Sequence, residues 1–352
     1  MATTLFDNVR RNYAATNQTR YSNSYRRRFM DKTILGDICN SNPDNIKSFL
    51  GVGKGSKVEM YVPTNVKVRE TKPDGGIIYQ QMTDSTVTFG LNHECYWAVQ
   101  YRPEDKRFMP FNPMSDTLAN ATDMVARHQE IAFGAHIPLC VPAFNQGANA
   151  GVKFRAFDLG TTVNPVMLFK TQTQVDDAAK AAVAASNDFH GDVAADFMLK
   201  MANTLRQGEG LSGYHVNIVI DSVIRHQLQT SELKYEGVMG RNAALGSDKR
   251  GGRSEVKFLG TMDDTIGVIQ DDIMFQALQQ EAVAATGERN LHPVFALMTD
   301  ACAFINETLL RDDAMKDVGN WNEHYRAKQV YDFPVMYPQM LALGWVKVMD
   351  HV

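Results

Sequence analysis

The alternation of apolar and polar residues between positions 57 and 102 predicts a long β-hairpin. Val58, Met60 and Val62 lie on one face of an extended strand, and the same two-residue period returns over residues 87–101. Proline and glycine supply the backbone angles of a turn between the two arms, which comprises Lys72, Pro73, Asp74, Gly75 and Gly76. Much of this hairpin is too polar to be buried within one chain, which indicates that another molecule covers it.

A helical period follows the hairpin. Asn112 is placed to cap the first turn and Pro113 to occupy it, and the helix is expected to end near residue 134. The stripe that faces the core recurs at steps of three and four residues and comprises Leu118, Ala121, Val125, His128 and Ala132. About 20 residues at 1.5 Å each give a rod on the order of 30 Å long.

Alternating helical and strand periods after residue 190 predict an α/β layer. Apolar residues repeat every four positions within a helix from Asp192 to Arg206. A strand at His215–Asp221 then leads into a helix that ends near Leu233, with Ser222 as the expected N-cap.

The remaining segments predict one loop, one helix and several returning strands. Residues 236–254 are rich in glycine and poor in apolar groups, which favours a mobile loop. A helix is expected over residues 273–285, and strands over 256–259, 265–270, 293–305 and 330–348. In the last of these ranges we expect edge strands, because Pro334 and Pro338 interrupt it.

Charge sets the first residues apart from the rest of the chain. The formal net charge is −4, of which residues 1–32 contribute +5, from seven basic and two acidic side chains, and the other 320 residues contribute −9. A basic arm on an acidic body is typical of contact with nucleic acid or with an acidic neighbouring subunit. Arg26, Arg27 and Arg28 are therefore candidate contact residues, and a solvated tail is the alternative.

The cysteine and hydropathy patterns favour a cytosolic setting. Cys39, Cys95, Cys140 and Cys302 lie far apart without metal-ligand or redox spacing, which predicts reduced and mostly buried thiols. No apolar run approaches the ~18 residues of a membrane span, and the first residues lack the apolar centre of a signal peptide.

Searches for catalytic motifs yield only weak candidates. The segment Gly51–Lys57 lacks the first glycine and the final Ser or Thr of a phosphate-binding loop. The acidic pairs at 263–264 and 271–272 are expected as solvated turn residues, and His128 and His136 as structural histidines. The local group of Asp221, Ser222 and His226 is the one cluster that an enzyme hypothesis can use. We therefore expect no catalytic residue, cofactor or metal.

The order of these elements resembles that of the Hong Kong 97-like major capsid proteins of tailed bacteriophages, over essentially the whole chain. The segments that weigh most are HVNIVIDSVIRHQL (215–228), which resembles a strand and helix of the family's axial domain, and VKFLGTMDDTIGVI (256–269), which resembles its returning strands. The resemblance implies an α+β fold. Its parts would be an N-terminal arm (1–50), an extended hairpin loop (51–105), a peripheral domain with a spine helix (106–149), an axial domain (150–290), and the rest of the peripheral domain (291–352).

The resemblance also implies partners and a location. The chain would assemble with itself into pentamers and hexamers of an icosahedral shell around double-stranded DNA, which it would contact non-specifically. The region before the hairpin is too short to hold a fused scaffolding domain, so a separate scaffolding protein is implied, together with a portal protein and, in some shells, a decoration protein. The protein would be assembled in the host cytoplasm, reside in the virion and contact no membrane. Lys67 and Lys72 are positional candidates for crosslinking between subunits.

Three alternatives remain open at this point. An encapsulin-type bacterial nanocompartment shell has the same fold. A cytosolic α/β enzyme would use the Asp221, Ser222 and His226 group. A phage tail or decoration protein fits less well, because the sequence shows no repeat and no sandwich pattern.

Overall fold

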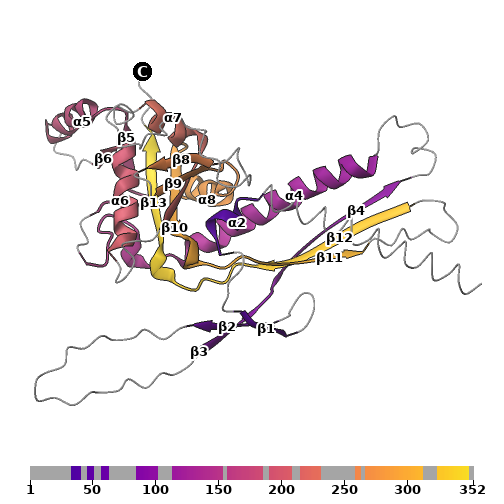
Figure 1. Ribbon diagram of the computed structural model, residues 1–352. Helices are drawn as coiled ribbons and strands as arrows, with labels where there is room; N and C mark the ends of the chain where they lie inside the picture. The colour runs from indigo at the N-terminus through magenta and orange to yellow at the C-terminus, as the bar shows by residue number, and fades with distance from the viewer. Residues whose placement is uncertain are drawn as a thin grey trace, which may run out of the picture.

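The computed structural model describes residues 33–40, 46–50, 57–62, 85–101, 113–153, 157–184, 190–207, 215–230, 258–262, 266–311 and 323–348. Helices and strands are mixed in these ranges, and the strands form one seven-stranded sheet and two three-stranded sheets. The α+β class predicted from the sequence is confirmed. Figure 1 shows the large sheet with its helices at one end, and the long helix α4 and the smaller sheets reaching away from it.

The seven-stranded sheet holds the core of the protein. Its strand order is β6-β5-β13-β10-β7-β9-β8. The bounds are β5 (Val166–Phe169), β6 (Gly191–Val193), β7 (Val216–Ile220), β8 (Phe258–Met262), β9 (Ile266–Gln270), β10 (Leu291–Met298) and β13 (Leu341–Val348). Every residue of β7 and β10 is buried, because helices cover both faces of the sheet.

The C-terminal strand corrects one prediction. Strand β13 lies inside the sheet, parallel to β5 on one side and antiparallel to β10 on the other, so it is not an edge strand. The two prolines that suggested an edge precede it. Pro334 lies in the connection from β12, and Pro338 begins the short 3-10 helix η5 (Pro338–Met340). Neither of these two prolines therefore removes a ladder hydrogen bond from β13.

Helices cover the two faces of the large sheet. On one face, α6 (Ala194–Arg206) packs so closely on β13 that a Cβ at Gly344 would lie 2.8 Å from Phe197 Cζ. On the other face, Phe295 of β10 makes ring contacts with Phe133 and with Phe275, just before α8 (Gln276–Thr286). Helix α7 (Ser222–Thr230) contacts α6, and α5 (Gln172–Ala184) packs on the β5–β6 edge.

The long predicted helix is confirmed as α4 (Pro113–His136). Its buried stripe differs from the prediction, because His128 is exposed and the neighbouring Gln129 and Glu130 are buried. Both buried side chains have partners: Gln129 Nε2 donates to Gln329 Oε1 at 2.8 Å, and Glu130 Oε1 accepts from the backbone N–H of Ile34 at 3.1 Å. Polar core positions of this kind interrupt the apolar period on which the prediction was based.

One three-stranded sheet contains the predicted hairpin. Strand β2 (Lys57–Val62) pairs antiparallel with β3 (Ser85–Gly90), which confirms the hairpin over these residues, and β1 (Ile46–Leu50) adds at the other edge of β2. The prediction was wrong for residues 93–101, which form β4 (His93–Tyr101) in the other small sheet. That sheet has the order β11-β12-β4, with β11 (Ile305–Arg311) and β12 (Glu323–Asp332). Long-range pairing with β12 cannot be recognised from the local alternation.

The first described segment packs against the core. It contains the one-turn helix α2 (Leu35–Ile38), whose Leu35 and Ile38 are fully buried. The residues that follow α2 reach Cys302: the Asn40 N–H donates to the Cys302 carbonyl at 3.0 Å, and the Phe304 N–H donates to the Asn40 carbonyl at 3.0 Å. This segment is thereby held beside the start of β11.

Candidate assembly surface

The contact residues predicted from the sequence lie outside the described part of the chain. They are Arg26, Arg27, Arg28, Lys67, Lys72, Pro73, Asp74, Gly75 and Gly76. Their roles stay predictions. The glycine-rich loop at 237–252 also lies outside the described residues.

The sheet β11-β12-β4 has one face that packs on α4. Residues at the odd-numbered positions of β4 from 93 to 99 are half-buried, and Trp97 and Cys95 pack against the main core. Opposite them on β12, Ala327 and Gln329 are buried, and Gln329 accepts the hydrogen bond from Gln129 of α4. The helix and the sheet therefore support each other along this face.

The other face of the same sheet is exposed along β4, whereas Val330 of β12, opposite Glu94 on that face, is fully buried. The even-numbered residues of β4 from 94 to 100 are all exposed, as expected where a strand covers the core with one face only. Tyr96 is 76% exposed, the largest exposure among the big apolar side chains of this sheet whose burial the structure describes. It lies directly opposite Lys328, whose ammonium pairs with Glu94 at 2.8 Å. An aromatic side chain framed by charges is typical of a protein–protein interface.

Sequence analysis missed Tyr96 because it followed the apolar phase of the strand. Trp97, Val99 and Tyr101 carry that phase, and Tyr96 falls in the polar phase between them. The useful signal would have been a large aromatic residue among the solvent-facing positions. Other exposed apolar side chains are scattered over different elements, namely Met124, Leu139, Val152, Val163 and Val223. Singly exposed residues are ordinary on protein surfaces, so these carry less weight.

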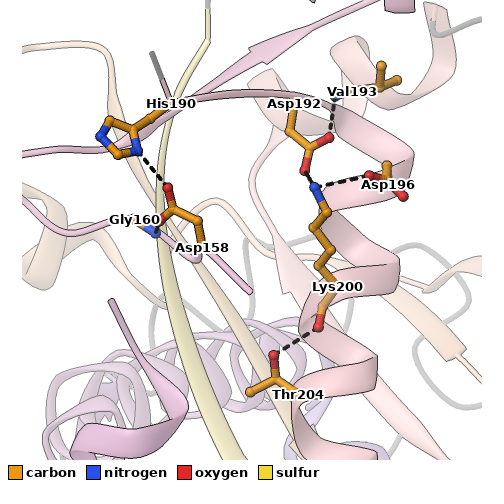
Figure 2. Close-up of polar contacts among 8 residues, drawn as sticks. All are labelled: Asp158, Gly160, His190, Asp192, Val193, Asp196, Lys200 and Thr204. Carbon is orange, nitrogen blue, oxygen red and sulfur yellow. Dashed lines mark hydrogen bonds and ion pairs between the residues drawn. The ribbon is translucent and has the colours of Figure 1, made fainter. Parts of the chain in front are cut away.

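A cluster of charged side chains lies at the β6–α6 junction (Figure 2). Lys200 donates to Asp192 at 2.6 Å and pairs with Asp196, one turn away on α6, at 3.1 Å. Burial raises the pKa of Asp192 to about 6, against the opposing effect of the Lys200 ammonium, and the Asp196 carboxylate adds to the rise. The Lys200 ammonium thus pairs with two carboxylates, and the pKa is raised in the more buried of them, Asp192.

A second contact in Figure 2 joins two loop segments near this cluster. His190 Nδ1 and Asp158 Oδ2 are 2.7 Å apart, and Asp158 Oδ1 accepts the N–H of Gly160 at 2.9 Å. Gly160 has a φ of +72°, and a Cβ there would lie 2.3 Å from the Trp345 carbonyl oxygen, so only glycine fits. These contacts fix the chain around the large sheet. Asp158 thus contacts both His190 and Gly160 of the same chain.

The residues of the enzyme hypothesis serve other purposes in the structure. Asp221 Oδ1 accepts the N–H of Ile224 at 2.8 Å, so Asp221 is the N-cap of α7, and the prediction that Ser222 is the cap was wrong. Asp221 Oδ2 contacts Nδ1 of His292, on the adjacent strand β10. The Ser222 N–H donates to Asp272 Oδ1 at 2.6 Å, and the side chains of Ser222 and His226 are exposed. Asp221 therefore orients His292 and the helix start.

The acidic pair at 271–272 is a turn, as predicted, but Asp271 is buried instead of solvated. Its Oδ1 accepts the N–H groups of Ile273 at 2.9 Å and of Met274 at 3.1 Å. Across the described ranges, no group of three or more His, Cys, Asp or Glu side chains is arranged to hold a metal ion. Within those same ranges no helix combines the length and the apolar character that crossing a membrane requires.

The arrangement of elements is similar to that of a chain in a solved phage capsid. A chain from the capsid of Ralstonia phage GP4 has a TM-score of 0.52 to this protein at 9% sequence identity, covering 89% of this chain and 88% of that chain. A chain from the head of Helicobacter pylori bacteriophage KHP40 has a TM-score of 0.48 at 8% identity, covering 90% and 91%. A chain from the capsid of Cyanophage P-SCSP1u has a TM-score of 0.45 at 12% identity, covering 86% of each.

The comparison with the GP4 capsid chain confirms the fold that the sequence predicted, the fold of phage capsid chains. The sequence itself matches no protein-family model and no curated protein. At this level of identity the likeness concerns the backbone arrangement. Its consequences for activity and partners are therefore matters of proposal.

Proposed function

We propose that this protein is the major capsid protein of a tailed bacteriophage, a subunit that assembles with copies of itself into a closed shell. The observation that carries the proposal is the fold shared with the GP4 capsid chain over nearly the whole length of both chains. A large sheet with its helices forms the compact part. The small sheets and the outer end of α4 extend beyond it, where they can reach neighbours (Figure 1).

The parts of the subunit take the roles implied by the resemblance. Residues 1–50 act as the N-terminal arm and 51–105 as the extended loop. Residues 106–149 and 291–352 form the peripheral domain around α4, and residues 150–290 form the axial domain. The hydrogen bond from Gln129 of α4 to Gln329 of β12 supports this division, because it joins residues 106–149 to residues 291–352.

The exposed face of the β11-β12-β4 sheet is the surface on which we place contact with a second copy of the chain. Tyr96 supplies apolar area on β4, at one edge of that face, and the Lys328–Glu94 pair supplies charges of both signs beside it. Aromatic residues contribute most of the energy of many interfaces, whereas exposed ion pairs mainly define orientation. Repetition by symmetry multiplies a modest contact over the whole shell.

The proposed assembly has further components. Pentamers and hexamers enclose a double-stranded DNA genome, and a separate scaffolding protein directs their assembly. A portal protein occupies one vertex, and a decoration protein is an additional partner in some shells. The protein is assembled in the host cytoplasm and resides in the virion, and it acts without catalysis, cofactor or metal.

The experiment that tests the proposal is sedimentation velocity combined with electron microscopy of the purified chain, alone and co-expressed with the scaffolding protein encoded beside it. We expect closed particles in the megadalton range. Deleting residues 71–77 should leave a folded subunit, with unchanged circular dichroism, that no longer forms particles. Stable monomers of the parent chain under every condition would contradict the proposal.

A further inference from the structure

Two cysteines that are distant in sequence meet in the core. Cys39 Sγ and Cys302 Sγ lie 3.5 Å apart, although 263 positions separate them along the chain. Both residues are buried, with exposed fractions of 1% and 0%. The spacing of cysteines in the sequence gave no sign of this pair.

The backbone on both sides of the pair is held in place. Asn40 and Ala303 form a parallel β-bridge, and each cysteine immediately precedes a residue of that bridge. Asn40 Nδ2 also donates to Asp300 Oδ1 at 3.2 Å. On its other side, Cys302 forms an antiparallel bridge with Val335. The two side chains therefore start from adjacent backbone segments that are held together, and a disulfide needs such proximity.

We propose that Cys39 and Cys302 are a disulfide-forming site, which fastens residues 33–40 to the start of β11 when the protein is oxidised. The sulfur atoms need to approach to about 2.05 Å, a side-chain adjustment between neighbouring thiols. The bond closes a very long loop, the case in which a crosslink restricts the unfolded chain most. It also fixes the segment that directly follows the basic residues 1–32.

The reaction uses a small-molecule disulfide such as oxidised glutathione. One cysteine thiolate attacks a glutathione sulfur and expels a glutathione thiolate, which gives a mixed disulfide. The second cysteine thiolate attacks the protein sulfur of that mixed disulfide and expels the second glutathione. Two protein thiols are oxidised, one glutathione disulfide is reduced to two glutathione molecules, and the two thiol protons pass to solvent or to the glutathione thiolates.

Burial protects the two thiols from oxidants in solution. It raises the pKa of Cys39 well above its usual value, and the neighbouring Cys302 adds to the rise, so little thiolate is present in the closed state. Glutathione reaches the pair when residues 33–40 lift locally or before they close during folding. The site therefore stays reduced in a reducing cytoplasm and oxidises in an oxidising one.

The test produces the full chain in cells with an oxidising cytoplasm and, separately, treats the chain made in ordinary cells with oxidised glutathione. Samples are quenched with N-ethylmaleimide, and their peptides are analysed by mass spectrometry. We expect a peptide that links Cys39 to Cys302 in the oxidising-cell sample. We also expect a thermal midpoint higher by about 5 °C, which dithiothreitol reverses.

Variants separate the proposed pair from other thiols. Cys39→Ser should lose both the linked peptide and the gain in midpoint, whereas Cys95→Ala and Cys140→Ala should keep both. Cys140 is the important control, because its pKa is raised by burial and by the charge of Cys302, which places it near the pair. A Cys140–Cys302 link, or alkylation of both buried thiols after oxidising expression and denaturation, would overturn the proposal.

Discussion

The large sheet and the β11-β12-β4 sheet differ in how much of their surface is buried within the subunit. In the large sheet, β10 and β7 are covered on both faces and all of their residues are buried. In the small sheet, one face packs on α4 and the other leaves Tyr96 76% exposed. Burial of apolar surface is the main favourable contribution to folding. The first region therefore stabilises the subunit by itself, and the second leaves part of its surface open, where we propose contact with another copy of the chain.

This comparison separates two kinds of substitution. A change in the large sheet or its helices should lower the stability of the single subunit. A change on the open face of the small sheet should leave the subunit folded and impair assembly. The following predictions are ordered by the size of the expected effect.

The largest effect is expected for Gly134→Ala. A Cβ at this position would lie 1.8 Å from the Met274 carbonyl oxygen, so α4 and the segment before α8 must move apart. We expect a loss of about 3 kcal/mol or more in the free energy of unfolding, measured by denaturant titration. Gly287→Ala is the matched control: its Cβ meets nothing within 4 Å but its φ is +77°, so it should lose only about 1–2 kcal/mol. Equal losses would contradict the close packing of α4.

The second prediction concerns the pH dependence of Asp192. Its pKa is raised from 3.8 to about 6, so between these values the folded state binds more protons than the unfolded state. Stability from this group is therefore present at low pH and is lost as the pH rises through 6, by an amount on the order of 1–2 kcal/mol once solvent screening is allowed for. Asp192→Asn removes this loss and keeps an acceptor for the Val193 N–H.

We expect the difference in unfolding free energy between Asp192→Asn and the parent to move in favour of the variant from pH 4 to pH 7. Urea titrations at both pH values measure it. Asp177→Asn, which removes an exposed carboxylate paired with Lys180, serves as the control and should show little change. A difference that moves in favour of the parent would mean that the Lys200 pair outweighs burial.

The third prediction is specific for the open face. Tyr96→Ala should change the unfolding free energy by less than about 0.5 kcal/mol, because the side chain is largely in solvent in the free subunit. The yield of assembled particles, measured by sedimentation, should fall several-fold. Lys180→Ala on α5, also exposed, should assemble like the parent. Normal yield from Tyr96→Ala would remove this face from the proposed contact.

The fourth prediction concerns the basic arm, where each ion pair is expected to contribute the least energy to assembly. If Arg26, Arg27 and Arg28 bind acidic neighbours, their triple alanine variant should assemble poorly even without DNA. Exposed ion pairs contribute about 0–1 kcal/mol each and weaken with salt, so yields of parent and variant should converge as salt increases. If empty particles form normally and only genome retention falls, the arm binds DNA. An unchanged yield at every salt concentration would reject the role between subunits.

Much of the fold could be predicted because its signals are local. The helix that begins at Pro113 and the strand at 216–220 follow directly from hydrophobic period and length. The partner of a strand is not a local property, so the sequence could not show that β4 pairs with β12 or that β13 lies inside the sheet. Buried polar residues such as Gln129 also interrupt the periodic signal.

The candidate site was harder to predict, for two physical reasons. Tyr96, at the proposed contact surface, is a single aromatic residue on the solvent-facing side of β4, so it leaves no periodic pattern. Contacts such as Cys39 with Cys302 depend on tertiary closure over most of the chain. Sequence reasoning instead selected charge clusters and turn residues, and those lie outside the described ranges.

Hydroxyl-radical footprinting of assembled and dissociated particles is the measurement that tests the central claim most directly. It reports the solvent access of individual side chains, and tyrosine is among the residues that react well. We expect labelling of Tyr96 to fall several-fold on assembly, while Phe295, already fully buried in the subunit, stays unlabelled in both states. Equal labelling of Tyr96 in assembled and dissociated protein would contradict the account.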